Sequence, residues 1–493
     1  MNLSKHGILP TLTLLTSIST FAHGAEPEKR PNIIIIMADD LGFGDLSCYG
    51  AKRIQTPGMD RLAKEGLQHL NGHASSATST PSRFAMLTGM YPFRVGAAIL
   101  PGDAPMLITE KMNTLPAMLK SAGYATGVVG KWHLGLGNGN MNWNEPITPS
   151  PNQIGFDYSY IMAATNDRVP TVYVKNGSVV NLDPNDPIEV SYKNNFPGEP
   201  TGKENPELLR MHPSVGHNMS ITNGIPRIGY MKGGKSALWE DETMYEVFLD
   251  EAKNFVSDHQ KEPFFLYYAL HQPHVPRLPN EKFAGKSQLG PRGDVILEAD
   301  WCVEQFLKHL DELGLTKNTL VILTSDNGPV LDDGYKDEAV ERNGDHRPAG
   351  PYRGWKTAPY EGGTCVPMLV RWPGHIQAGQ TSEALIAQMD FTQSFAALLN
   401  KDYQTPDGEN VAEALIGSSP KGRERLVLEG YGKSIWIKEG DWACIPSYTN
   451  RQGKVFPAEL YDLKNDVAQQ TNLAEKHPDK VRALTAKLEE VRK

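Results

Sequence analysis

The stretch Asn32-Ile33-Ile34-Ile35-Ile36-Met37-Ala38-Asp39-Asp40 joins an uninterrupted apolar run to two adjacent carboxylates. An apolar run of this length without alternation predicts a β-strand buried on both faces, as in a parallel sheet covered by helices. Asp39 and Asp40 would then follow the carboxyl end of that strand, where open α/β sheets bind their ligands.

Four further segments repeat the pattern of a short apolar run that ends in polar residues: 124–129, 263–268, 319–323 and 366–372. Helical patterns lie between them, in residues 114–123 with Thr114 as the predicted N-cap, and in residues 294–314 with Gly314 as the predicted stop. Strands that alternate with helices predict the α/β class, with a large, mostly parallel sheet sandwiched by helices.

Composition divides the chain beyond its first 24 residues into two predicted parts, the first of which contains an insertion. Residues 25–409 carry the strand and helix alternation and form the predicted catalytic domain. Within it, residues 136–235 are rich in Asn, Pro and Gly and predict a long substrate-facing insertion, with a mere surface excursion as the alternative. Residues 410–493 contain short strand patterns and a final amphipathic helix at 478–491, and predict a small C-terminal α+β subdomain.

The first 24 residues have the pattern of an export signal. Lys5 and His6 precede an apolar stretch, and Ala22-His23-Gly24 offers small residues before a cut near Ala25. The apolar stretch is too short to span a bilayer. The pattern predicts a mature protein that is periplasmic or secreted, with no membrane span.

Charge and cysteine content narrow the function classes. The chain of 493 residues has a formal net charge of −9, which argues against a nucleic-acid partner. An anionic substrate must therefore be attracted by a local group of cations. The four cysteines show no metal-ligand spacing and are expected to be free thiols, with one disulfide left open: Cys48, Cys302, Cys365 and Cys444.

Two pairs of oxygen-bearing side chains follow predicted strands. Asp39-Asp40 repel each other unless a cation neutralises them, and Asp326-Asn327 follows another apolar run. Oxygen-only ligands favour Ca²⁺ or Mg²⁺. Asp39-Asp40 alone could equally cap a helix, but the two pairs together predict a metal site.

Cations and imidazoles follow other predicted strands. Lys131 and His133 follow the strand predicted at residues 124–129, and Lys356 lies in a separate loop. His271 and His274 bracket a proline after the strand at 263–268, and His274 is the preferred one for chemistry. Each could be a surface or structural residue if it stood alone.

The stretch Ser79-Thr80-Pro81-Ser82-Arg83-Phe84-Ala85-Met86-Leu87-Thr88-Gly89 carries the most specific pattern. A helix here would place Arg83 beside Ser79, one turn away. The stretch resembles the maturation segment of the formylglycine-dependent sulfatases, which are arylsulfatase-like enzymes of the alkaline phosphatase superfold. In that pattern, Cys or Ser followed by x-Pro-x-Arg is oxidised to Cα-formylglycine. Because residue 79 is Ser, the resemblance implies maturation by an anaerobic radical S-adenosylmethionine enzyme.

The resemblance extends over nearly the whole chain after residue 24 and implies a site. It implies one Ca²⁺ bound by Asp39, Asp40, Asp326, Asn327 and the modified residue 79. Further matches are Gly130-Lys131-Trp132-His133, Pro273-His274-Val275-Pro276, Lys356 with Glu361-Gly362-Gly363, and Glu459-Leu460-Tyr461-Asp462-Leu463 near the C-terminus. Thr165-Asn166-Asp167 falls near a polar contact of the family to sulfate.

The implied activity is that of a sulfuric ester hydrolase. A hydrated aldehyde has two hydroxyls: one attacks sulfur, and deprotonating the other expels sulfate. Arg83, Lys131 and Lys356 would hold the sulfate, Asp326 would help to deprotonate the nucleophile, and His133 would take the second proton. His274, with Lys356, would protonate the leaving oxygen.

A sulfated carbohydrate is the expected substrate. The stretch from Asn166 to Pro187, with Asp332-Asp333-Gly334-Tyr335 and Gly344-Asp345-His346, resembles bacterial glycan exo-sulfatases acting on galactose or N-acetylgalactosamine 6-sulfate. Asn166, Asp167 and Arg168, with Asp345 and His346, are the candidate contacts to sugar hydroxyls. Two alternatives stay open: a phosphomonoester or phosphonate hydrolase of the same superfold, and a glycan-binding protein without activity.

Overall fold

The computed structural model describes residue 1 and residues 30–493, apart from 433 and 451. The predicted export signal, with its cut near Ala25, lies outside the described residues. Within the described residues, no helix has the length and apolar character needed to cross a membrane. All four cysteines are described and are free thiols.

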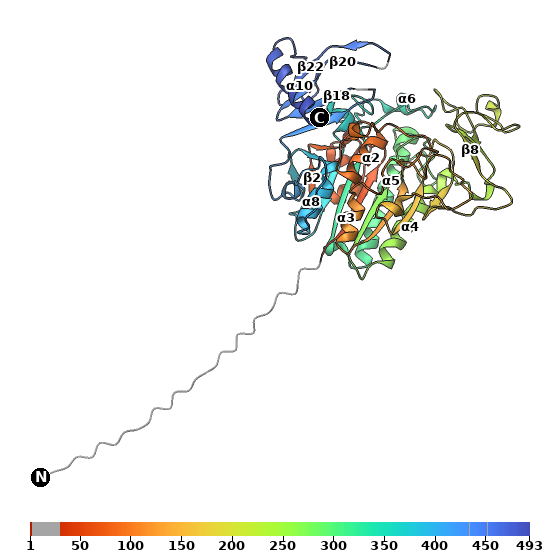
Figure 1. Ribbon diagram of the computed structural model, residues 1–493, viewed down its shortest axis with the longest axis horizontal. Helices are drawn as coiled ribbons and strands as arrows, with labels where there is room; N and C mark the ends of the chain where they lie inside the picture. Colours follow the sequence, from red (N-terminus) through yellow and green to blue (C-terminus); the bar gives the residue numbers. More distant parts are fainter. Residues whose placement is uncertain (2–29, 433, 451) are drawn as a thin grey trace.

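A mixed sheet of ten strands forms the centre of the molecule (Figure 1). Its order is β15-β2-β14-β13-β1-β12-β4-β5-β6-β7, and the five strands from β13 to β5 run parallel. The bounds are β1 (Asn32–Ala38), β2 (Leu67–His69), β4 (Ala125–Lys131), β5 (Tyr158–Met162), β6 (Tyr173–Lys175), β7 (Ser178–Val179), β12 (Phe264–Ala269), β13 (Thr319–Ser325), β14 (Met368–Arg371) and β15 (Gln380–Ser382).

The strand predicted at residues 366–372 exists as β14, but its direction was predicted wrongly. It runs antiparallel to both β13 and β2, so this side of the sheet is mixed. An apolar run reports burial on both faces, which a central antiparallel strand also has, and it carries no information on direction.

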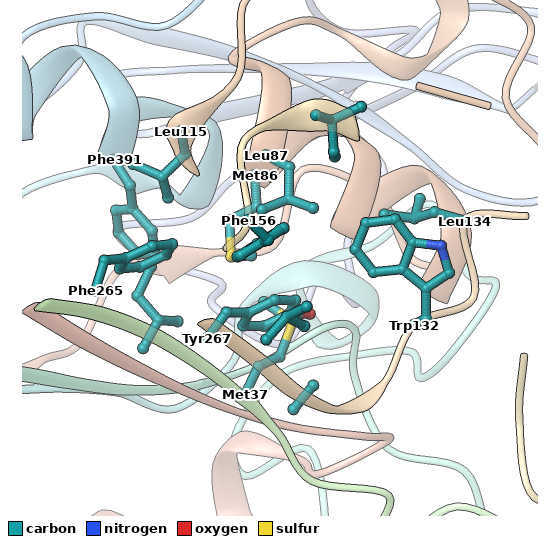
Figure 2. Packing of buried hydrophobic residues seen from close by; sticks show 14 of the residues in the cluster. Met37, Met86, Leu87, Leu115, Trp132, Leu134, Phe156, Phe265, Tyr267 and Phe391 are labelled. Atoms are coloured by element: carbon teal, nitrogen blue, oxygen red, sulfur yellow. The ribbon is translucent and has the colours of Figure 1, made fainter. Parts of the chain in front are cut away.

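Helices cover both faces of the sheet. Successive residues of β1 alternate between two cores: Ile33, Ile35 and Met37 pack in one, and Ile34, Ile36 and Ala38 in the other. Figure 2 shows the first core, where Met37 and Tyr267 of the sheet lie near Met86, Leu87 and Trp132. The helices on that side are α2 (Ser79–Thr88), α3 (Leu115–Ser121) and α8 (Phe391–Leu398); those on the other are α1 (Pro57–Glu65), α4 (Met244–Asp258) and α5 (Gly290–Glu312).

Residues 136–235 contain more regular structure than their composition predicts. The first part supplies β5, β6 and β7, which extend the central sheet. Two small ribbons follow, β8 (Glu189–Ser191) with β11 (Tyr230–Lys232) and β9 (Ile221–Thr222) with β10 (Ile225–Pro226). These strands have two to five residues, too few for a periodic signal. In Figure 1 the β8 region lies at the opposite end of the molecule from the C-terminal sheet.

A second sheet forms the predicted small C-terminal α+β subdomain. It consists of β17 (Arg425–Glu429), β18 (Ile435–Glu439), β19 (Trp442–Ile445) and β22 (Glu459–Asp462), and α10 (Pro478–Arg492) packs on it. Its core includes Ala85 of α2, so the subdomain is packed directly against the helix that begins at Ser79. Shorter elements are β3 (Gly72–His73), β16 (Ile386–Ala387), β20 (Tyr448–Thr449), β21 (Val455–Phe456), α6 (Ala339–Asn343), α7 (Glu361–Thr364) and α9 (Ala412–Leu415).

Candidate active site

The carboxyl ends of the parallel strands bring the predicted polar residues together. The register of β1 and β13 pairs Ala38 with Ser325, so Asp39 and Asp326 leave the sheet side by side. Lys131 is the last residue of β4, and His274 follows β12. This is the edge where a parallel sheet presents its loops to a ligand.

Three buried carboxylates and two lysines form the centre of this group. Nζ of Lys131 lies 2.6 Å from Oδ1 of Asp39 and 3.5 Å from Oδ2 of Asp326. Nζ of Lys356 lies 2.9 Å from Oδ2 of Asp40. Because the Asp and Lys131 side chains are fully buried, each charge depends on its partners for the stabilisation that water would supply.

Ser79 is the first residue of α2 and points into this group. Its Oγ donates to Oδ2 of Asp326 and lies 2.5 Å from Nζ of Lys131. Arg83, one turn later, places Nε 3.3 Å from the same Oγ and donates from its NH2 group to Asp326 at 2.8 Å. The predicted pairing of Ser79 with Arg83 on one side of a helix is thus present.

Tyr267 also contacts this group, although the sequence did not single it out. Its hydroxyl accepts a hydrogen bond of 2.8 Å from Arg83, which fixes the guanidinium against Asp326. Tyr267 lies inside the apolar run of β12, where it is typical of a core residue. The run itself holds no signal for a polar contact.

Two oxygen atoms of the group fit a hard cation. Oδ2 of Asp39 and Oδ1 of Asn327 are buried and have no hydrogen-bond partner among the described residues. Asp39, Asp40 and His274 also place one ligand atom each within 4.8 Å of one another. Buried polar atoms without partners are costly, and carboxylate and amide oxygens are the donors that Ca²⁺ and Mg²⁺ prefer.

Burial and neighbouring charges shift the pKa values of Asp39 and Asp326 in opposite directions. Burial raises the pKa of Asp39 well above its usual value, and Asp326 and Asp40 add to the shift against the opposing effect of Lys131. Burial acts in the same direction on Asp326, but Arg83 and Lys131 outweigh it and hold its pKa far below normal. Asp39 is therefore the carboxylate that most needs a further cation to stay ionised.

His133 and His274 each hold their ring in place through one nitrogen that contacts a backbone carbonyl. Nε2 of His133 lies 3.0 Å from the carbonyl of Leu100, and Nδ1 has no partner among the described residues. Nδ1 of His274 lies 2.7 Å from the carbonyl of Val275, so Nε2 faces Asp40 and Asp333 at 3.9 Å. Burial, with a contribution from Lys356, lowers the pKa of His274 to about 4.

The loop after β5 supplies a second polar group beside His274. Thr165 donates to Asp167, and Arg168 donates to Oδ1 of Asp167 at 2.8 Å. Nε2 of His217, from residues 136–235, lies 2.9 Å from Oδ2 of Asp167. Asn166 donates weakly to the carbonyl of His274 at 3.4 Å and has a free buried Oδ1. The four residues predicted from Thr165 to Arg168 are thus brought together, and His217 joins them.

Asp345 and His346 are not brought to this group. His346 is buried, and its Nε2 lies 2.8 Å from Oδ1 of Asp45, a carboxylate that also binds Arg292. The side chain of Asp345 is 92% exposed and faces Arg53. The residue that does join the group from this part of the chain is Asp333, which lies 2.7 Å from Nζ of Lys356. We therefore omit Asp345 and His346 from the proposed substrate contacts.

Cations around a buried serine suit the binding of an anionic ester at this edge of the sheet. The chain belongs to the sulfatase family, whose sequence profile matches residues 31–401, and it is a sulfuric ester hydrolase.

Individual relatives agree with this family assignment. The chain is 48% identical over 501 residues to an N-acetylgalactosamine-6-O-sulfatase of Bacteroides thetaiotaomicron, covering 98% of both chains. It is 31% identical over 482 residues to human arylsulfatase A, covering 92% of this chain and 85% of the relative. A solved structure from work on glycosaminoglycan metabolism by Bacteroides thetaiotaomicron superposes with a TM-score of 0.91 and 49% identity, covering 94% of this chain and 99% of the other.

Proposed function

We propose that the protein hydrolyses sulfate monoesters of carbohydrates, with 6-sulfated N-acetylgalactosamine or galactose as the preferred substrates, through a formylglycine made from Ser79. The surroundings of Ser79 Oγ carry this proposal. Nζ of Lys131 lies 2.5 Å away, Nε of Arg83 lies 3.3 Å away, and Oδ2 of Asp326 accepts a hydrogen bond from the hydroxyl. An ester placed here would meet two cations at the sulfate and a base at the nucleophile.

Asp39, Asp40, Asp326 and Asn327 would hold a Ca²⁺ ion, with residue 79 at its side. The free Oδ2 of Asp39 and Oδ1 of Asn327 support this set. When bound, the ion would supply positive charge at a sulfate oxygen as the S–O bond breaks. It would also favour the ionised form of Asp39, whose pKa is otherwise raised by burial.

Conversion of Ser79 to an aldehyde would supply, once hydrated, a nucleophilic hydroxyl and a second hydroxyl through which sulfate can be released. Asp326 accepts a hydrogen bond at this position and is placed to take the first proton. Nδ1 of His133 is a free acceptor in a ring whose pKa burial lowers well below normal, so it stays neutral at pH 7. That state suits a base for the second proton.

His274 and Lys356 would serve the leaving oxygen of the sugar. Asp333 and Asp40 overcome the effect of burial and raise the pKa of Lys356, which therefore stays protonated. The pKa of His274 is about 4, so His274 is neutral at pH 7 before substrate binds. An anionic ester beside its ring would favour the protonated form, which is the form that can act as an acid.

The group formed by Thr165, Asp167, Arg168 and His217 is proposed to hold the sugar. Asp167 accepts hydrogen bonds, Arg168 and His217 donate them, and Asn166 of the same loop donates to the carbonyl of His274. Such alternating donors and acceptors match neighbouring sugar hydroxyls. The name of the relative that is 48% identical supports a 6-sulfated N-acetylgalactosamine.

The test begins with maturation. After co-expression with an anaerobic radical S-adenosylmethionine maturase, mass spectrometry of the Ser79 peptide should show the loss of two hydrogens. The same preparation is then assayed on matched sulfate and phosphate esters and on 6-sulfated N-acetylgalactosamine, galactose and N-acetylglucosamine. Faster cleavage of the phosphate ester would favour a phosphohydrolase, and an active enzyme with unmodified Ser79 would contradict the aldehyde.

Export is a further part of the proposal and has its own test. The basic residues, apolar stretch and small residues at the beginning of the chain support cleavage near Ala25. Sequencing of the mature N-terminus after expression in a bacterium with a periplasm should begin at or next to this residue. A full-length protein confined to the cytoplasm would contradict it.

A further inference from the structure

A second buried group of charged side chains lies where the C-terminal subdomain meets the large domain. Nζ of Lys438, on β18, lies 2.7 Å from Oε2 of Glu361 and 2.7 Å from Oδ1 of Asn71. The same Nζ lies 3.3 Å from Nε2 of His73. Lys438 is only 5% exposed and Glu361 only 2%, so the ion pair is closed off from water. We call Lys438, Glu361, His73 and Asn71 the seam cluster.

The seam cluster has the ligand types of a metal site but already contains a cation. His73, Glu361 and Cys365 each offer one ligand atom, and these atoms lie within 4.8 Å of one another. The ammonium of Lys438 contacts both Glu361 and His73. Burial and this neighbouring ammonium lower the pKa of His73 well below normal, so His73 is neutral. Lys438 is the counter-ion of Glu361. The effect of this ion pair therefore depends on the segments of the chain that Glu361 connects.

Glu361 is the first residue of α7 and follows the Lys356 loop, which comprises residues 353–360. Its backbone N–H donates to Oε1 of Gln469 at 2.8 Å, a second tie to the C-terminal subdomain. Gln469 is in turn linked through its carbonyl to Arg353, which precedes Lys356 by three residues. Both ends of the Lys356 loop are therefore fastened to residues of the C-terminal subdomain.

The middle of the loop has a third tie. Thr357 has φ +77°, a left-handed conformation that is strained for a β-branched residue. Its N–H donates to the carbonyl of Ala77 at 2.8 Å, and its carbonyl accepts from the N–H of Tyr431 at 2.8 Å. Ala77 also donates to the carbonyl of Glu429 at the end of β17. The loop, the residues before Ser79 and the end of β17 thus form one hydrogen-bonded unit.

We propose that the C-terminal sheet holds the active-site lysine in place, and that Lys438 is a positioning residue that acts through Glu361 and Lys356. The ties to Glu361 and Thr357 keep Nζ of Lys356 2.9 Å from Asp40 and 2.7 Å from Asp333. Without Lys438, Glu361 would be a buried carboxylate without a counter-ion, and the end of the loop would shift toward water. The inference rests on the proposed role of Lys356 in sulfate ester cleavage.

The test compares matured enzymes that differ at Lys438. Lys438→Met keeps most of the side-chain length but removes the charge, and Lys438→Arg keeps the charge. Lys454→Met is the matched control, because Lys454 is exposed in the same subdomain. We expect Lys438→Met to lower kcat/KM by about 10–100-fold, since displacements of about 1 Å can cost 10²-fold. Lys438→Arg should recover part of the loss, and Lys454→Met should match the wild type.

A double-mutant cycle separates positioning from general destabilisation. If Lys438 acts through Lys356, then Lys438→Met should cause no further loss in a Lys356→Ala background. An equal loss in both backgrounds would overturn the inference while leaving the role of Lys356 intact. A harmless Lys356→Ala would overturn both. No cleavage of any sulfate ester by the matured wild type would instead contradict the proposed function.

A second variant covers the case in which Lys438→Met does not fold. Gln469→Ala removes only the acceptor of the Glu361 N–H and leaves the ion pair in place. It should lower kcat/KM in the same direction but less, again without effect in the Lys356→Ala background. Thermal melting of each variant monitors folding, and an unchanged kcat/KM for folded Gln469→Ala, or an equal loss in the Lys356→Ala background, contradicts positioning.

Discussion

The active-site group and the seam cluster are both buried and both pair carboxylates with lysine, but they differ in how many charges they contain. In the seam cluster a single ammonium contacts Glu361, Asn71 and His73, and Oε1 of Glu361 has no partner among the described residues. In the active-site group, three carboxylates face Arg83, Lys131 and Lys356, and oxygen atoms of Asp39 and Asn327 still have no partner within the described structure.

The difference shows how the same residue types serve two purposes. A buried pair of one carboxylate and one ammonium holds two parts of the chain together, because separating the charges would leave both of them unpaired. A group that gathers three carboxylates and has unpaired oxygens on two residues keeps the capacity to bind an ion. Function is therefore expected where several carboxylates and unpaired oxygens gather, and the predictions below test that contrast.

The largest effect is expected at Ser79. Ser79→Ala removes the hydroxyl that Lys131, Arg83 and Asp326 surround, and loss of a nucleophile lowers kcat on the order of 10⁴–10⁶-fold. Ser75→Ala is the control, since the Ser75 hydroxyl is buried without a partner in the described residues. Steady-state assays of the matured proteins measure both. Retention of more than a hundredth of the activity by Ser79→Ala would place the nucleophile elsewhere.

The next effect depends on the leaving group. His274→Ala should lower hydrolysis of a sugar sulfate by about 10²–10⁴-fold, the usual contribution of a general acid, but should scarcely affect nitrophenyl sulfate, whose leaving group needs no proton. Arg83→Ala should harm both substrates, because Arg83 contacts residue 79 itself. Equal losses on both substrates for His274→Ala would make His274 a sulfate contact, and His271 the next residue to test.

Metal binding is expected in the active-site group and not in the seam cluster, where the ammonium of Lys438 already contacts Glu361 and His73. Mutations of residues that merely orient metal ligands cost about 10–100-fold in affinity or activity, so Asp39→Asn should cost at least about 100-fold in both. Calorimetric titration with Ca²⁺ and assays with and without chelator measure this. Asp345→Asn, at an exposed carboxylate, is the control. Full activity of metal-free protein in excess chelator would exclude the site.

Much of the central sheet could be predicted, because a buried strand depends on its own composition. The runs of β1 and β13 are continuous in Ile, Leu and Val, and their polar ends gave Asp39, Asp40, Asp326 and Asn327. The direction of β14 and the short strands β5 to β7 depend on their neighbours in the sheet instead. An apolar pattern records burial but not pairing.

The parts of the site that the sequence did not reveal arise from contacts between distant residues. His217 meets Asp167 across 50 positions, and His346, predicted as a substrate contact, binds Asp45 across 301. The sequence Asp345-His346 looks the same whether the histidine contacts a substrate or a buried carboxylate. Which carboxylate it meets is decided by the fold, so the resemblance of motifs located the centre of the site better than its rim.

The smallest effect is expected at a carboxyl group that forms no ion pair within the described residues, which extends the contrast to a third case. Glu298 of α5 is buried and accepts hydrogen bonds from Gln272 and from the N–H of Asn280. Burial raises the pKa of Glu298 to about 7. Well below pH 4.5, the ordinary pKa of this carboxyl, the group is protonated in both folded and unfolded chains, and its ionisation does not affect the free energy of unfolding. As the pH rises toward 7, the unfolded chain ionises first, so the wild type loses stability in this interval.

Glu298→Gln cannot ionise, and any fixed cost of the substitution is the same at every pH. Relative to the wild type, the variant should therefore gain about 1 kcal/mol between pH 5 and pH 8, allowing for relaxation of the site. Urea denaturation at both pH values measures the gain, with exposed Glu281→Gln as the control. A difference that does not change with pH would show that Glu298 ionises normally, as a carboxylate with a nearby counter-ion would.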